Sequence, residues 1–434
     1  MEPMWLRSWL STLSALGSCG MLGLCCWLRC CTPVLGGGRK LRARILAMFM
    51  PSMLMGLLLA LTAFEPRELV FDEVHYVQSA REILGKGFYE MHTHPPLGKE
   101  LIAAGIQLAG DGPVGWRLFP AVFGVASAAL LALVVYLGTG SALAGFVASL
   151  GLALDPLHFT QSRVAMLDVF QTPLLLGALA VMLWRRGLKW LAVAGALAGL
   201  AAACKLPAAV IGLSLGLYFS LSEESWRRRV GRLLCYGASA VAAYILTYLP
   251  YFACGHGLVE WIKDTQMFML YVGTAFKFDH PYTSPACTWL IGWKPVLYYY
   301  KVDQSGSYVH AILAVGNVAS WLPSFALLLK QLSYPRGDMD LLPAVWFAPC
   351  YVSLMLIRRP AFIFYMEPLI PALYMSVGVE VGCFAGEERA LAAATATVLY
   401  LASALLLLPL SIGTLVPVSY LQRMLIVGRA LWGG

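Results

Sequence analysis

Residues 70–101 read VFDEVHYVQSAREILGKGFYEMHTHPPLGKEL. They form a polar interval in a chain of 434 residues whose composition is 59% hydrophobic and 12% charged. Three of the seven histidines of the chain fall inside this interval, beside an Asp72–Glu73 pair. Strongly apolar runs enclose it on both sides, so we expect a polar loop between two membrane-embedded segments.

Within this interval the residue pattern predicts two helices. Asp72 can cap a helix from Glu73 to about Leu84, and Gly85 is a plausible stop. On that helix one face would carry a polar stripe at helical spacing, namely Asp72, His75, Tyr76 and Ser79. The Pro95-Pro96 pair favours extended backbone before a second, amphipathic helix over residues 97–109. The alternative reading is a solvated loop in which Asp72 is a helix cap alone.

The composition indicates an integral membrane protein, because several apolar windows of about 20 residues can each cross a hydrocarbon core of about 30 Å. The formal net charge of +8 comes from short Lys and Arg clusters between the apolar runs. That arrangement is typical of positive-inside topology and not of a nucleic-acid-binding groove. The cysteines near the N-terminus have no histidine beside them, so we expect no metal site.

Hydropathy and loop charge together predict about 11 core spans, with the N-terminus inside and the C-terminus outside. Residues 1–44 would form a cytosolic leader, which could also hold an extra span or anchor, and residues 45–434 the transmembrane domain. Residues 65–115 and 253–308 would form external loops. The predicted spans are residues 45–64, 116–137, 142–157, 169–183, 190–203, 207–221, 233–252, 310–330, 341–356, 361–384 and 391–408.

This topology brings ionisable residues from several separate connections to the external membrane boundary. Such groups are costly at span ends unless they are paired or hydrated, so together they indicate a polar cavity. For a single Lys or Arg, snorkelling at the interface is the alternative. The converging residues are Asp72, Glu73, His94, Lys99, Arg163, Asp168, Lys205, Arg358 and Arg359.

The FDEVHY and HPPLGKELIA segments resemble the first external loop of the protein O-mannosyltransferases, which are membrane glycosyltransferases of the GT-C type. QSRVAMLD (161–168), ACKLP (203–207), HPYTSPACTWLIGWKPVLYYY (280–300) and FIFYMEPLIP (362–371) are similar to further segments of that family. Val169 departs from the family pattern, which more often has Ser after this Asp. The 253–308 interval is too short for the sugar-binding MIR insertion, so the resemblance is to the MIR-less, bacterial-like branch.

The resemblance implies an all-α polytopic membrane protein with a GT-C fold. It implies Asp72 as the catalytic base and Glu73 as the residue that shapes its orientation or charge. Arg163 is implied as the first phosphate ligand, followed by Lys205 and His94, and the external cations Lys99, Arg358 and Arg359 join this predicted set. The predicted sugar or acceptor contacts are His75, Tyr76, Asp168, His280, Tyr282, Trp289 and Trp293; for the aromatic residues, a place in the interfacial belt is the alternative.

These residue types suit transfer of a sugar from a polyprenyl phosphate. Arg and Lys stabilise the leaving phosphate, and the acceptor hydroxyl needs a carboxylate base. No nucleotide-binding motif occurs in a useful setting, which argues against a nucleotide sugar. A GT-C enzyme that uses another lipid-linked sugar or a lipid acceptor, such as an aminoarabinose transferase, is the main alternative. A transporter is disfavoured because we see no internal repeat.

The resemblance therefore implies transfer of mannose from dolichyl-phosphate-mannose to Ser or Thr of exported proteins. The implied partners are the lipid-linked donor, the acceptor protein and membrane lipid, without nucleic acid, cofactor or metal, and with a homo- or heterodimer open. We expect the endoplasmic reticulum membrane, with a bacterial plasma membrane as the alternative.

Overall fold

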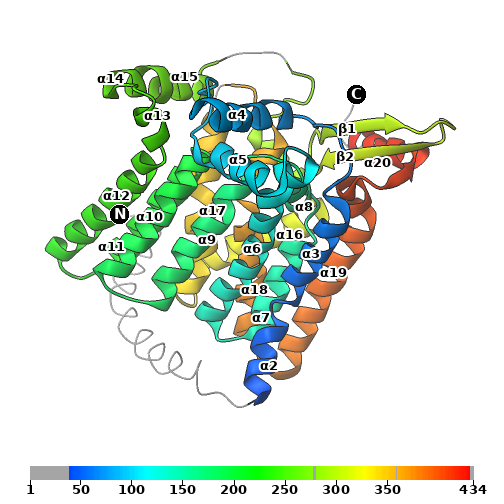
Figure 1. The fold of residues 1–434 in the computed structure, drawn as a ribbon. Helices are drawn as coiled ribbons and strands as arrows, with labels where there is room; N and C mark the ends of the chain where they lie inside the picture. The colour runs from blue at the N-terminus through cyan, green and yellow to red at the C-terminus, as the bar shows by residue number, and fades with distance from the viewer. Residues whose placement is uncertain (1–38, 277–279, 358, 431–434) are drawn as a thin grey trace, which may run out of the picture.

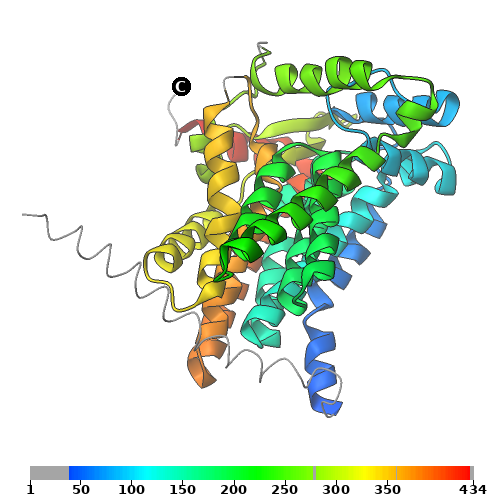
Figure 2. The same ribbon diagram turned by 90° about the vertical axis from the view of Figure 1, so that its left-hand side faces the viewer.

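Apolar helices run side by side through the molecule, and shorter helices and a hairpin cover one end of them (Figures 1 and 2). A computed structural model describes residues 39–276, 280–357 and 359–430. The helices of the bundle are α2 (Arg39–Ala47), α3 (Met50–Thr62), α6 (Pro113–Thr139), α7 (Ala142–Ala153), α8 (Pro156–Arg163), α9 (Asp168–Trp184), α10 (Leu188–Cys204), α11 (Pro207–Leu221), α12 (Trp226–Leu246), α16 (Val318–Ser333), α17 (Asp338–Leu356), α18 (Ile370–Cys383) and α19 (Gly386–Ile412).

Each predicted span overlaps at least one of these helices, so the expected multi-pass architecture is confirmed in its coarse form. Among the described residues, four helices are long and apolar enough to cross a membrane alone, and the pair α7 and α8, bent by 65°, makes up to five. Four further apolar helices are shorter, with 10–17 residues. The number of spans therefore stays a prediction, as do the proposed domain limits. The proposed leader falls mostly on residues 1–38, outside the described residues.

The first external loop forms the two predicted helices, α4 (Glu73–Lys86) and α5 (Leu97–Ala109). The prediction that α4 stops at Gly85 was wrong, because the helix continues to Lys86 and ends at Gly87. Gly87 has φ of 87°, a left-handed conformation that glycine adopts without steric cost, and its N–H caps the carbonyl of Ile83.

The second external loop contains short helices and the start of a sheet, so the expectation of an all-α chain was wrong in this part. β1 (Val296–Val302) pairs antiparallel with β2 (Tyr308–Ala314), which pairs with β3 (Leu415–Pro417). Aromatic and β-branched residues in VLYYYKV favour a strand, and the DQSGS segment supplies the turn. Residues 310–314 are therefore strand and not the start of a span. The remaining elements are α13 (Leu249–Ala253), α14 (Leu258–Glu260), η1 (Trp261–Met267), α15 (Phe268–Thr274), η2 (Ala286–Ile291), η3 (Ile363–Met366) and α20 (Val418–Ala430).

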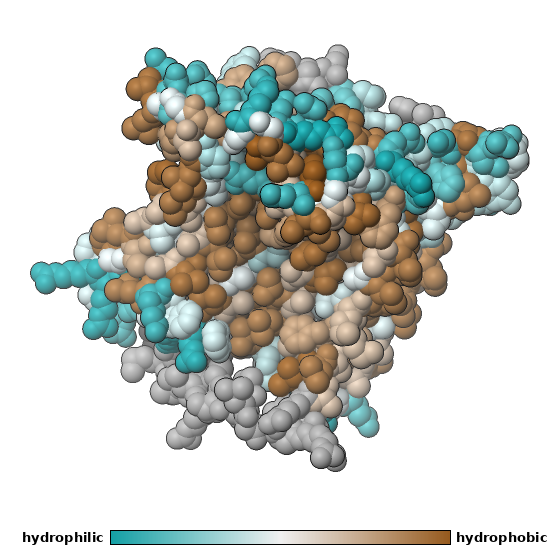
Figure 3. Space-filling view, viewed as in Figure 1, coloured by the Kyte–Doolittle hydropathy of each residue, from teal (hydrophilic) through white to brown (hydrophobic). Residues whose placement is uncertain are grey.

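One end of the bundle carries α4, α5, α15 and the hairpin, while the connections from α9 to α10 and from α11 to α12 lie at the other end (Figure 1). Hydrophilic residues gather over the first end, and hydrophobic residues cover the sides of the helices below it (Figure 3). This distribution fits a membrane-embedded body with a polar external cap.

We therefore predict that the Asp72 loop and the arginine cluster 227–232 face opposite sides of the membrane. Val74 is 44% exposed, and the Arg228 side chain is 76% exposed, so a cysteine at either position is accessible to a reagent. In a background with the native cysteines changed to serine, an impermeant maleimide applied to sealed vesicles should label one of V74C and R228C. The other should react only after permeabilisation. Labelling of both from the same side would refute this topology.

Candidate active site

Asp72 occupies the N-cap position of α4 but does not act as a cap. Within the described residues its side chain makes no capping hydrogen bond, and the hydroxyl of Tyr76 lies 3.5 Å from its Oδ2. The preceding residue, Phe71, has φ of 50°, which is uncommon for a residue with a side chain. The carboxylate of Asp72 is therefore not engaged as a helix cap in the described structure.

Glu73, by contrast, is fully buried and its carboxylate is saturated. Its Oε1 and Oε2 accept from Nε and Nη2 of Arg117 on α6, each at 2.8 Å. The same oxygens accept backbone N–H groups from Ala165 at 2.7 Å and from Val70 at 2.9 Å. Arg117 also donates to the carbonyls of Ala63, Pro66 and Glu68. This bidentate pair ties the loop before Asp72 to α6 and to the segment before α9.

A second buried ion pair, between Lys205 and Asp168, belongs to the candidate site. Lys205, which follows α10, donates to both carboxylate oxygens of Asp168 at the start of α9, at 2.8 and 2.7 Å. Its ammonium also lies 4.8 Å from the ring centroid of Tyr365 and 5.5 Å from that of Phe364. Because an ammonium has three N–H donors, one remains after the two bonds to Asp168.

Asp72 is electrostatically coupled to this second pair. Burial raises the pKa of the Asp72 carboxyl above its ordinary value, and the positive charges of Lys205 and His75 and the Tyr76 hydroxyl oppose that shift. His280 opposes it as well. The predicted residues Asp72, Tyr76, Asp168, Lys205 and His280 therefore share one electrostatic neighbourhood.

His94 and Arg359 border the same neighbourhood. Burial and the positive charges of Lys205, Lys99 and Arg359 hold the pKa of His94 well below its ordinary value, so its imidazole is neutral. Arg359 donates to the hydroxyl of Tyr365 at 2.6 Å and to the carbonyl of Val272 at 2.9 Å. Arg358, predicted alongside it, lies outside the described residues.

Two other predicted phosphate ligands are engaged by backbone carbonyls. Lys99 donates to the carbonyls of Met91 at 2.7 Å and His94 at 3.2 Å, and its ammonium sits 3.7 Å from the ring centroid of Tyr89. Arg163, at the end of α8, donates to the carbonyls of Thr62, Glu65 and Ser411. That Lys99 and Arg163 bind the phosphate of the sugar donor stays a prediction. Their bonds to backbone carbonyls are those of residues that support the walls of the site.

The predicted aromatic contacts fall into two groups. Trp289 is fully buried, donates to Ser284 at 2.9 Å and packs against Tyr365, so its ring belongs to the core beneath the site. Tyr282 and Trp293 are half-buried, and the ring of Tyr282 lies tilted against that of His280 with centroids 5.5 Å apart. His75 is exposed on α4.

The sequence pattern did not single out Arg117, Tyr298 or Tyr365. Arg117 had a signal, since it is a single charge inside a 27-residue apolar helix. Tyr298 is buried in β1, stacks on Phe71 with centroids 4.3 Å apart, and accepts a hydrogen bond from Gln161. Its place beside Asp72 depends on the sheet, which the span prediction did not include.

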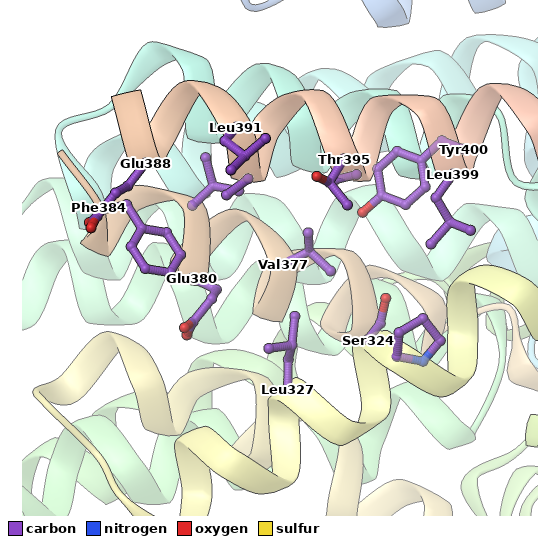
Figure 4. Close-up of a pocket in the computed structure, with 14 residues that line it drawn as sticks. Ser324, Leu327, Val377, Glu380, Phe384, Glu388, Leu391, Thr395, Leu399 and Tyr400 are labelled. Atoms are coloured by element: carbon purple, nitrogen blue, oxygen red, sulfur yellow. The ribbon is translucent and has the colours of Figure 1, made fainter. Parts of the chain in front are cut away.

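A separate groove of about 540 Å³ lies between α16, α18 and α19 (Figure 4). Its walls are mostly apolar, and its charged lining residues are Glu380 and Glu388, near the end of the bundle opposite α4. Two carboxylates do not bind a phosphate, so we do not place the reaction there.

We predict that Arg117→Ala destabilises the protein strongly, because it leaves the Glu73 carboxylate buried and unpaired. Removing one partner of a buried pair costs about 3–5 kcal/mol. The matched control is Arg81→Ala, which breaks the exposed Arg81–Asp111 pair, whose side chains are 39% and 46% exposed; exposed pairs contribute about 0–1 kcal/mol. Thermal unfolding in detergent measures both variants. Equal losses of thermal stability would show that the Glu73–Arg117 pair is not a structural anchor.

Comparisons with known proteins give matches both by sequence and by fold. Two profiles, each described as dolichyl-phosphate-mannose-protein mannosyltransferase, match residues 93–252 and 51–116. The polyprenol-phosphate-mannose–protein mannosyltransferase of Mycobacterium tuberculosis is 28% identical over 406 residues, covering 72% of this chain and 75% of that protein.

Two solved structures share the fold at low sequence identity. The Saccharomyces cerevisiae protein O-mannosyltransferase Pmt1–Pmt2 complex bound to the sugar donor superposes with a TM-score of 0.73 at 11% identity, covering 86% of this chain and 90% of that chain. ArnT from Cupriavidus metallidurans bound to undecaprenyl phosphate gives a TM-score of 0.60 at 17% identity, covering 91% of this chain and 74% of that chain. Its sequence matches, in the first external loop and the helices that follow, make the chain similar to the dolichyl-/polyprenyl-phosphate-mannose–protein mannosyltransferases.

Proposed function

We propose that this chain transfers mannose from a polyprenyl phosphate to Ser or Thr hydroxyls of proteins at the external face, with Asp72 as the base. One observation carries the proposal. The Asp72 carboxylate is half-buried, does not cap its helix, and is electrostatically coupled to the Lys205–Asp168 pair. Sequence similarity to the polyprenyl-phosphate-mannose–protein mannosyltransferases supports the donor and the protein acceptor.

In the proposed step, the acceptor hydroxyl gives its proton to Asp72 while its oxygen attacks the anomeric carbon of the sugar. The bond from that carbon to the phosphate oxygen breaks, and the electron pair leaves with the polyprenyl phosphate. Attack from the face opposite the phosphate inverts the anomeric centre, so a β-linked donor gives an α-linked product. The raised pKa of Asp72 suits this role, because it makes the carboxylate a stronger base.

The departing phosphate needs positive charge and hydrogen-bond donors. Lys205 keeps one N–H after its bonds to Asp168, and Arg359 is half-buried beside Tyr365. We assign the phosphate to these two cations, with neutral His94 as a further donor. Lys99 and Arg163 would then shape the site through the backbone carbonyls that they hold.

A transferase with a lipid acceptor, like an aminoarabinose transferase, is the second candidate, because the ArnT structure shares the fold. Product analysis separates the two: label from polyprenyl-phosphate mannose should appear on a Ser/Thr peptide and not on lipid. We place the protein in the endoplasmic reticulum membrane with its site in the lumen. A bacterial plasma membrane is the alternative, since the relatives include bacterial and yeast proteins.

We predict that Asp72→Asn yields a folded protein that binds donor and is nearly inactive. Asn preserves the size of the side chain but cannot accept the proton, and base assistance contributes about 10²–10⁴-fold in rate. Turnover with labelled donor and a Ser/Thr peptide measures the loss, and donor binding with thermal unfolding provides the control. If Asp72→Asn keeps more than about a tenth of wild-type turnover, a base worth 10²-fold is excluded.

We also predict that His75→Gln shifts the acid limb of kcat/KM to higher pH. The limb follows deprotonation of Asp72, and the positive charge of His75 opposes the burial that raises its pKa. Removing that charge therefore raises the pKa of Asp72 further, and the shift should shrink at high ionic strength. Arg67→Gln is the control, since Arg67 is exposed and pairs with Glu65. A shift toward lower pH, or an equal shift in both variants, would contradict the role of Asp72.

A further inference from the structure

β1 is an edge strand that runs directly from the site to solvent. The sheet has the order β1-β2-β3, so β2 pairs one side of β1. Among the described residues, no hydrogen bond reaches the backbone groups on its other side. An unpaired strand edge is a template for pairing with another extended chain.

The bulge in β1 connects this strand to the Asp72 loop. The register with β2 shifts between Leu297 and Tyr299, so Tyr298 is the extra residue. Its ring turns inward onto Phe71, with centroids 4.3 Å apart, and Phe71 precedes Asp72. Bulges of this kind re-aim a side chain beside active sites. The strand beyond the bulge therefore starts beside the proposed base.

The Asp72 loop contacts one face of this strand through Glu68 and leaves the outer edge of the strand unpaired among the described residues. Tyr299 and Lys301 lie two residues apart, hence on the same face, and both reach Glu68. Tyr300 and Val302 point to the other face and are 49% and 42% exposed.

The ladder pattern identifies which backbone groups face outward. The N–H of Asp303 donates to the carbonyl of Tyr308 at 3.0 Å, which marks this pair as hydrogen-bonded. Bonded and non-bonded pairs alternate in an antiparallel ladder. From the register Val302–Val309 and Tyr300–Ala311, the N–H and C=O groups of Val302 and Tyr300 point away from β2.

We propose that the acceptor polypeptide binds as an added strand on this free edge of β1, which places its hydroxyl beside Asp72. The proposal rests on the proposed protein mannosyltransferase function and specifies its acceptor site. Strand addition draws its affinity from main-chain hydrogen bonds, so it accepts Ser/Thr segments of differing sequence. With a rise of about 3.3 Å per residue, the acceptor residues two to four positions from the attacked hydroxyl would pair along Tyr300 and Val302.

Backbone N-methylation of the acceptor tests this directly with the full-length wild-type chain. A series of peptides with one Thr each carries a single N-methyl group at successive positions, with labelled polyprenyl-phosphate mannose as donor. On one side of the Thr, kcat/KM should fall about tenfold at alternate positions. At each of these positions the methyl group replaces a peptide N–H that would donate to β1, and it also blocks close approach of the two strands. The intervening positions are the matched controls and should change by less than about threefold, because their N–H groups point away from β1. A series without this period of two would overturn the proposal.

A protein variant provides the reciprocal measurement. Tyr300→Pro removes an outward N–H, and proline is tolerated at such edge positions. It should raise the KM for peptide about tenfold while the KM for donor stays at the wild-type value. An unchanged peptide KM, or a change in oligomeric state alone, would overturn the proposal. If the unmodified peptide receives no mannose, both the proposed function and this inference fail. If the unmodified peptide is labelled but kcat/KM does not alternate along the N-methylated series, only this inference fails.

Discussion

The buried pair between Glu73 and Arg117 is the constraint on which the external cap depends. Glu73 is the first residue of α4, and Arg117 lies in the first turns of α6, so their bidentate contact fixes a loop onto the bundle. The remaining donors of Arg117 hold the carbonyls of Ala63, Pro66 and Glu68, which are the backbone groups leaving α3. Taking two charges out of water is costly, and this pair offsets the cost because the described hydrogen bonds satisfy both partners.

A consequence of this anchoring is that two adjacent carboxylates have different surroundings. Each Glu73 oxygen accepts two hydrogen bonds, from Arg117 and from the N–H of Val70 or Ala165. Both oxygens are therefore already engaged by donors. Asp72, one residue earlier, has among the described residues a side-chain hydrogen bond from Tyr76 and is electrostatically coupled to Lys205 and His280. The same turn of chain therefore supplies a structural anion, Glu73, and the carboxylate that we propose as the base, Asp72.

The sequence predicts the elements that local periodicity and loop charge determine. Spans such as residues 207–221 coincide with a helix because a continuous apolar run leaves no alternative in a membrane. The site could be predicted only as a set of converging residues. Whether a cation such as Arg163 faces a phosphate or backbone carbonyls depends on contacts with Thr62 and Ser411, far away in sequence. The sheet was missed because β3 and β1 are separated by more than 100 residues, and the 310–330 interval has the apolar composition of a span.

The position of the sheet explains why the second external loop and the end of α19 belong to the same functional unit. β3 follows α19 and pairs with β2, while Arg163 donates to the carbonyl of Ser411 in the last turn of that helix. The C-terminal helix is thereby joined to the hairpin on one side and to α8 on the other. Tyr298 of the hairpin in turn packs on Phe71, so the C-terminal segment is connected through the sheet to the residue preceding Asp72. The first and last thirds of the chain therefore position the proposed base together, although the FDEVHY and HPPLGKELIA segments lie in the first third.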